Sequence, residues 1–231
     1  MEQLPSYADS RLVSSCIYCG QATESRDHVP SRILLDEPYP ENLPVVPACV
    51  ACNQGFSQDE QYFACFIECA LTGAIEAVRR PKIARVLREN PALATRISNS
   101  RSTTLTDTIL FAVEHERAKQ VVLKLARGHA AYEVSEVLRS APSHILITPL
   151  ETLDNFSRHH FETVPESAIW PEVGSRAMQR LIIARKDVTA EGWIEVQPDR
   201  YRYFVVAAGP VMVRVVLSEY LACEVIWNDN A

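Results

Sequence analysis

The sequence has little glycine and no long uninterrupted apolar run. Glycine occurs 7 times in 231 residues, which predicts a compact protein with few flexible hinges. No run approaches the roughly 18 apolar residues that a membrane-spanning helix requires. The N-terminal Met-Glu-Gln-Leu-Pro lacks the basic start and apolar middle of a signal peptide. We therefore expect a cytoplasmic protein with no membrane partner.

No internal repeat, low-complexity tract or Gly/Ser-rich linker marks a boundary in the chain. Hydrophobic residues make up 47% and charged residues 23% of the sequence, a composition that excludes disordered and collagen-like proteins. A chain of 231 residues accommodates one large domain or two small ones with a buried core. The 7 cysteines indicate metal ligands or core thiols rather than a disulfide framework.

The chain also lacks an excess of positive charge. Its net charge of −6 argues against a protein that coats nucleic acid by electrostatics alone. The charge is unevenly distributed: residues 79–139 hold 12 basic and 6 acidic side chains, whereas residues 1–78 hold 3 basic and 11 acidic ones. The positive middle segment is compatible with a phosphate-binding face and equally with a solvated helical face.

Residues 1–60 are rich in cysteine, proline and short apolar runs, and a helical period begins only at their end. The hydroxyl of Ser57 followed by the carboxylate of Glu60 matches a capping box, which predicts a helix to about residue 72. Apolar residues at helical spacing predict a longer helix from Thr108 to about Leu125. Its apolar face contains Ala118, Val121, Val122 and Leu125. The charged residues that lie largely off this face are Glu116, Arg117, Lys119 and Lys124.

After Pro142 the composition changes to that of β structure. Runs rich in valine, isoleucine and aromatic residues predict strands at residues 144–148, 193–196, 201–207, 211–217 and 223–227. Turn signals separate the last runs, so the simplest arrangement is an antiparallel meander. The predicted fold class is α+β. Residues 1–60 form an N-terminal module that runs into a helix to about residue 72, and residues 73–231 form a helical and β region that packs with it.

Two Cys-x-x-Cys pairs dominate the N-terminal module. A pair on a tight turn directs both thiolates at one point, and two pairs complete the tetrahedron of a closed structural zinc site. The predicted ligands are Cys16, Cys19, Cys49 and Cys52. The second pair begins 30 residues after the first ends, so the zinc would close a long loop. Such a site stabilises a fold and does no chemistry itself.

Four polar residues lie between or directly after the cysteine pairs: Asp27, His28, Asn42 and Asn53. Each alone is typical of a turn, a core or an exposed surface. With the cysteines they form the ordered pattern Cys-x-x-Cys, Asp-His-x-Pro, Asn-Leu-x-Val-x-x-x-Cys-x-x-Cys-Asn. This combined pattern resembles the HNH endonucleases, in particular the zinc-stapled members with a ββα-metal active site. The resemblance covers about residues 14–60.

The resemblance implies a metal-dependent endonuclease that hydrolyses phosphodiester bonds in DNA. It implies that His28 is the general base, that Asp27 and Asn53 bind Mg²⁺ or Mn²⁺, and that Asn42 orients the imidazole of His28. A histidine with a pKa near 6.5 suits proton abstraction from water at neutral pH. Successive side chains on a strand point to opposite faces, so the strand must end or distort after His28 for both Asp27 and His28 to serve one site. The last residue of the pattern is often histidine in the family, and in this chain it is Asn53.

Many family members have a basic residue shortly after the position of Asn53, where it can contact phosphate. This chain has none there, so phosphate contacts must come from other parts of the sequence. The candidate nucleic-acid contacts are Arg26, Arg32, Arg79, Arg80 and Lys82. DNA is the expected partner, and the C-terminal region is a candidate surface for a protein partner or a second copy. The alternative is a non-catalytic zinc-stapled module that binds nucleic acid or protein. A nuclease held inactive until a partner binds is a variant of the first interpretation.

Overall fold

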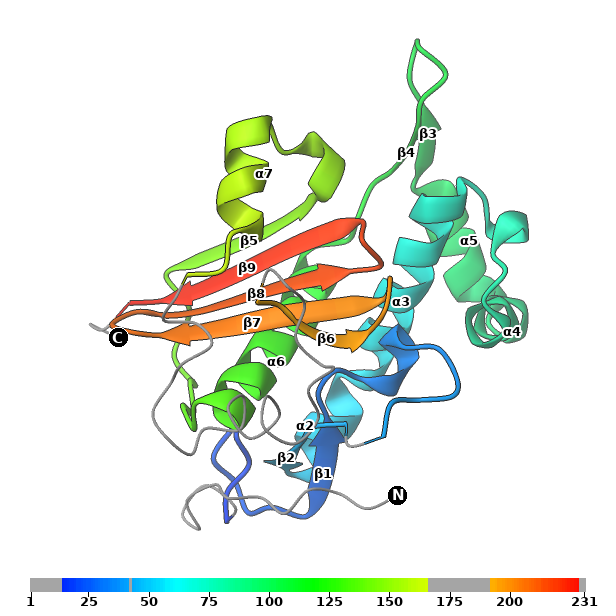
Figure 1. The fold of residues 1–231 in the computed structure, drawn as a ribbon. Helices are drawn as coiled ribbons and strands as arrows, with labels where there is room; N and C mark the ends of the chain where they lie inside the picture. The colour runs from blue at the N-terminus through cyan, green and yellow to red at the C-terminus, as the bar shows by residue number, and fades with distance from the viewer. Residues whose placement is uncertain (1–13, 42, 166–191, 229–231) are drawn as a thin grey trace. The chain divides into compact units, whose positions relative to one another are not determined.

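The structure is a computed structural model that describes residues 14–41, 43–165 and 192–228 (Figure 1). Its helices and strands make a mixed α+β protein, as the sequence predicts. The chain divides into two units, the first with residues 1–55 and 122–231 and the second with residues 56–121. The N-terminal residues therefore group with the C-terminal part of the chain. Within the described ranges, no helix has both the length and the apolar character needed to cross a membrane.

Two short strands and a helix follow one another near the N-terminus of the first unit. β1 (Ser25–His28) pairs antiparallel with β2 (Val45–Ala48), and α2 (Val50–Gly55) follows β2 almost directly. The loop between the strands contains a 3-10 helix at Arg32–Leu34. This order places the second Cys-x-x-Cys pair at the junction of β2 and α2.

The C-terminal part of the first unit is a five-stranded antiparallel sheet with strand order β5-β9-β8-β7-β6. Four of its strands form the predicted meander, and β5 is added at the edge beside β9. The predicted runs match the observed strands to within two residues at each end. The strands are β5 (His144–Pro149), β6 (Ile194–Gln197), β7 (Tyr201–Ala207), β8 (Val211–Leu217) and β9 (Leu221–Trp227).

A helix packs on each face of this sheet. α7 (Asn155–Glu162) follows a 3-10 helix at Leu150–Thr152 and covers one face (Figure 1). The buried cluster on that face contains Leu150, Phe161, Trp193, Phe204, Val206, Val216 and Ala222. The end of α6 (His115–Glu133) covers the other face, where the ring of His129 stacks on that of Tyr203 with centroids 3.6 Å apart. The strands β7, β8 and β9 are therefore buried on both faces.

The second unit is helical with one small hairpin. α3 is the longest element that lies wholly within it, and a 3-10 helix at Ile75–Ala77 joins α3 to α4. The elements are α3 (Ser57–Thr72), α4 (Pro81–Glu89), α5 (Pro91–Asn99), β3 (Arg101–Thr103) and β4 (Ile109–Phe111). The predicted start of α3 at Ser57 is confirmed, but the predicted capping box is wrong. The N-cap residue is Phe56, with a helical backbone and no side-chain cap.

The long helix begins later than the sequence predicts. Ile109–Phe111 form β4, which pairs with β3 across a turn closed by Asp107 at a positive φ of 59°, and α6 begins only at His115. β-branched and aromatic residues favour the hairpin over a helix here. The predicted apolar face is confirmed, because Ala118, Val121, Val122 and Leu125 are all buried. The expectation for Lys124 is wrong, because its side chain is buried as well.

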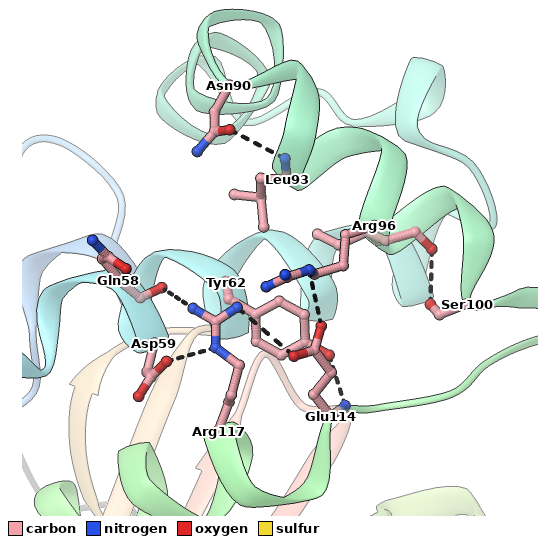
Figure 2. A network of polar contacts seen from close by, with 10 residues as sticks. Gln58, Asp59, Tyr62, Asn90, Leu93, Arg96, Ser100, Glu114 and Arg117 are labelled. Carbon is pink, nitrogen blue, oxygen red and sulfur yellow. Dashed lines mark hydrogen bonds and ion pairs between the residues drawn. The ribbon is translucent and has the colours of Figure 1, made fainter.

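Arg117, in the first turns of α6, is bound to α3 within the second unit (Figure 2). Its guanidinium donates to the carboxylate of Asp59 and to the carbonyl of Gln58, the latter at 3.0 Å. The same group lies 4.6 Å from the ring centre of Tyr62. The Tyr62 hydroxyl in turn accepts the backbone N–H of Glu114 at 2.8 Å. These contacts fix the residues around the start of α6 against α3.

Candidate functional site

The predicted four-cysteine cluster is confirmed. The Sγ atoms of Cys16, Cys19, Cys49 and Cys52 all lie within 4.8 Å of one another. In the first pair the chain turns tightly, because Gly20, at a positive φ of 82°, donates its N–H to the Cys16 carbonyl at 2.9 Å. Four convergent thiols with no position left open suit a structural zinc ion rather than a catalytic one.

The thiols of this cluster differ in acidity. Burial alone would raise the pKa of Cys16, but hydrogen bonds from the backbone of Cys49, Cys19 and Tyr18 lower it to about 7. The pKa of the Cys52 thiol is raised, chiefly by burial and then by the neighbouring cysteine side chains. A cluster with one acidic thiol can begin to bind a cation at neutral pH, since thiolates are the metal ligands.

The segment after α6 contacts the first cysteine pair through hydrogen bonds. Arg139 donates from Nη2 to the carbonyl of Cys16 at 3.0 Å and to the hydroxyl of Ser15 at 3.3 Å. Arg127 holds this segment in turn, through a 3.0 Å hydrogen bond to the Arg139 carbonyl. The C-terminal half of α6 therefore supports the cysteine cluster from a part of the sequence more than 100 residues away.

His28 lies at the end of β1 and is half-buried. Its Nε2 atom is 3.0 Å from Nη2 of Arg32. A guanidinium can only donate, so Nε2 must be the acceptor and the ring proton must sit on Nδ1. Burial, and then the positive charge of Arg32, lower the pKa of His28 below its usual 6.5. His28 is therefore neutral at physiological pH, the form that a general base requires.

Asp27 points to the other side of β1, into the interior. Nζ of Lys124 lies 2.9 Å from its Oδ2 and 3.1 Å from its Oδ1, and the Tyr18 hydroxyl donates to Oδ2 at 2.8 Å. Lys124 also donates to the hydroxyl of Ser31 at 2.9 Å. In this conformation the carboxylate expected to bind a metal ion is bound to a cation of the chain itself.

Asn53 lies in α2 beside β1. Its side-chain Nδ2 donates to the Ser25 hydroxyl and to the Arg26 carbonyl, both at 3.2 Å. The structure thus brings Asn53 to the strand that carries His28. The other predicted asparagine, Asn42, lies outside the described residues.

The predicted phosphate contacts fall into two groups. Arg26 and Arg32 are exposed on β1 and on the following loop of the first unit. In the second unit Arg79 is exposed and Lys82 is partly exposed, at the start of α4. Arg80 is the exception among these five residues. It is buried, and its Nη1 donates to the carboxylate of Glu68 at 3.1 Å.

Sequence reasoning missed the residues that hold Asp27 and the cysteine cluster, namely Tyr18, Ser31, Lys124 and Arg139. Lys124 gave no local signal, since helical spacing places it off the predicted apolar face. Its partner lies 97 residues away, so only the tertiary structure identifies the pair. The remaining cysteines are core residues, as the sequence predicts: Cys65, Cys69 and Cys223 are buried.

Searches against protein-family models, curated proteins and solved structures find no match for this chain. The candidate site combines a closed thiol cluster, a neutral histidine at a strand end, and two oxygen-bearing side chains on β1 and α2.

Proposed function

We propose that this protein is a metal-dependent endonuclease of the HNH type that hydrolyses phosphodiester bonds in DNA, with zinc bound structurally by the four cysteines. One observation carries the proposal. The thiol cluster joins the chain just before β1 to the junction of β2 and α2, and this strand–strand–helix segment carries His28 at the end of β1 and Asn53 beside that strand. The ordered sequence motif supports the same assignment.

His28 is the proposed general base. In its neutral form it accepts a proton from the attacking water at Nε2, the atom that now accepts a hydrogen bond from Arg32. Once released from Nε2, the Arg32 guanidinium is a donor for a phosphate oxygen. The Asn42 side chain is the proposed orienting group for the imidazole.

Asp27 and Asn53 are the proposed ligands of Mg²⁺ or Mn²⁺, because carboxylate and amide oxygens suit these ions better than zinc. When bound, the ion supplies positive charge to the phosphate oxygens and the leaving alkoxide. The donor types fit, but Asp27 must first leave Lys124, since both of its oxygens lie near that ammonium.

A second function is favoured by this same ion pair. If Asp27 remains bound to Lys124 and Tyr18, the N-terminal segment is a non-catalytic zinc-stapled module that binds nucleic acid or protein. Cations just before α4 and along it support a nucleic-acid partner under either function. Exposed Arg79 directly precedes the N-cap of α4. Partly exposed Lys82 and exposed Arg85 and Arg88 lie on the side of α4 opposite buried Ile83 and Leu87.

A plasmid-cleavage assay on the purified full chain separates the two functions. The nuclease proposal expects nicking or linearisation with Mg²⁺ or Mn²⁺, loss of cleavage under chelation mild enough to leave the thiol-bound zinc in place, and recovery on adding Mg²⁺ or Mn²⁺. Full recovery with zinc alone would contradict the oxygen-ligand assignment. DNA binding without cleavage under every metal condition would favour the non-catalytic module.

A further inference from the structure

The ammonium of Lys124 is enclosed by oxygen atoms. Its side chain is 1% exposed and that of Asp27 7% exposed. Nζ lies within 3.1 Å of both carboxylate oxygens of Asp27 and of the Ser31 hydroxyl. The Tyr18 hydroxyl donates to Oδ2 of the same carboxylate. The buried ammonium is thus bound by carboxylate and hydroxyl oxygens, and divalent cations also take oxygen ligands.

A divalent ion and this ammonium cannot share Asp27 in place. Two cations on one buried carboxylate would repel each other strongly, because solvent screening is weak in the interior. A divalent ion would also compete with hydrogen bonds from Lys124 at both carboxylate oxygens and from Tyr18 at Oδ2.

We propose that Lys124 is a built-in competitor for the divalent ion at Asp27. The Lys124–Asp27 ion pair and metal coordination by Asp27 are mutually exclusive, so metal binding there requires the ammonium to leave the carboxylate. Lys124 belongs to the half of α6 that packs on the sheet. Binding of a divalent ion at Asp27 is therefore coupled to a movement of the Lys124 side chain. The inference rests on the proposed function, because that function makes Asp27 a metal ligand.

Mn²⁺ titration of the zinc-loaded full chain, followed by electron paramagnetic resonance, tests this inference without measuring activity. Lys124→Gln removes the charge and keeps a hydrogen-bond donor, so we expect it to bind Mn²⁺ at least about fivefold more tightly than the unmodified protein, within the usual range of coupling between two sites. The added Asp27→Asn substitution should abolish that gain. Lys119→Gln, an exposed lysine on the same helix, is the matched control and should leave Mn²⁺ affinity unchanged.

Unchanged or weaker Mn²⁺ binding in folded, zinc-loaded Lys124→Gln would overturn the inference. So would a gain that survives Asp27→Asn. If Lys124→Gln does not fold, the unmodified protein provides the test: the NMR signal of the Lys124 side-chain ammonium should shift or disappear as Mg²⁺ is added. An unperturbed signal at tens of millimolar Mg²⁺ would also overturn it.

Cleavage assays on the same samples keep this inference distinct from the proposed function. Metal-dependent cleavage with an unperturbed Lys124 signal would reject the inference and leave the nuclease in place. A Lys124 signal that responds to Mg²⁺ in a protein without cleavage activity would support the inference and reject the nuclease.

Discussion

His28 and Arg32 show how one contact adds to burial in setting the state of a side chain. The guanidinium offers only donors, so it fixes the tautomer of the imidazole, and its charge opposes protonation of the ring. Arg32 lies four positions after His28, and the sequence indicated it only as a candidate phosphate contact. Its contact with Nε2, which adds to the effect of burial in lowering the pKa of His28, depends on the loop geometry that follows β1.

The first prediction concerns this histidine in the divalent-metal-free protein. NMR titration should give His28 a pKa below 6.5, and Arg32→Gln should raise it toward that value because a positive neighbour is removed. Since the unfolded chain binds the proton more readily, His28 makes stability fall as the pH drops from 6.5 through the folded pKa. A His28 pKa that stays the same in Arg32→Gln would contradict the role given to Arg32.

At the scale of elements, strands were easier to predict than helix ends. Runs of β-branched and aromatic residues located all five strands of the large sheet, and the signal is continuous in β7, β8 and β9, whose residues are mostly buried. The start of α6 and the cap of α3 were mispredicted because each depends on a neighbour: the β3–β4 hairpin and the end of α2. The burial of Lys124 depends on Asp27, which no local pattern reveals.

Gly128 on α6 gives the second prediction. A Cβ added there would lie 2.5 Å from Cγ2 of Val29, directly after the proposed general base. Gly128→Ala should therefore lower the free energy of unfolding by about 1–3 kcal/mol, as overpacking does, in spite of the better helix propensity of alanine. Gly55→Ala in α2, with nothing within 4 Å, is the control and should be neutral or stabilising. Urea unfolding measures both, and equal stability of the two variants would refute the close approach.

At the scale of the whole molecule, the cysteine cluster could be predicted in full and the division into units could not. The spacing of two Cys-x-x-Cys pairs predicts four thiols that converge on one point, and the structure brings the four Sγ atoms within 4.8 Å of one another. The grouping of residues 1–55 with residues 122–231 arises from contacts between distant parts of the chain. Arg139 on Cys16 and Lys124 on Asp27 are two of them.

The third prediction follows from the cluster. Purified protein should contain close to one zinc ion per chain by elemental analysis. Cys16→Ser or Cys49→Ser should unfold the N-terminal segment, because structural zinc in small folds supplies roughly 10 kcal/mol or more. Cys65→Ser, a core thiol outside the cluster, is the control and should keep its zinc. Folded protein without zinc would refute the assignment.

The rate of plasmid cleavage by His28→Ala tests the central claim most directly. His28 is the only histidine in residues 1–60, so no neighbouring imidazole can replace it. We predict at least about a 100-fold loss of Mg²⁺-dependent cleavage, the usual scale for a positioned general base, with zinc content and circular dichroism unchanged. His159→Ala, on the exposed surface of α7, should cleave like the unmodified protein. Cleavage by His28→Ala at the unmodified rate would contradict the nuclease assignment.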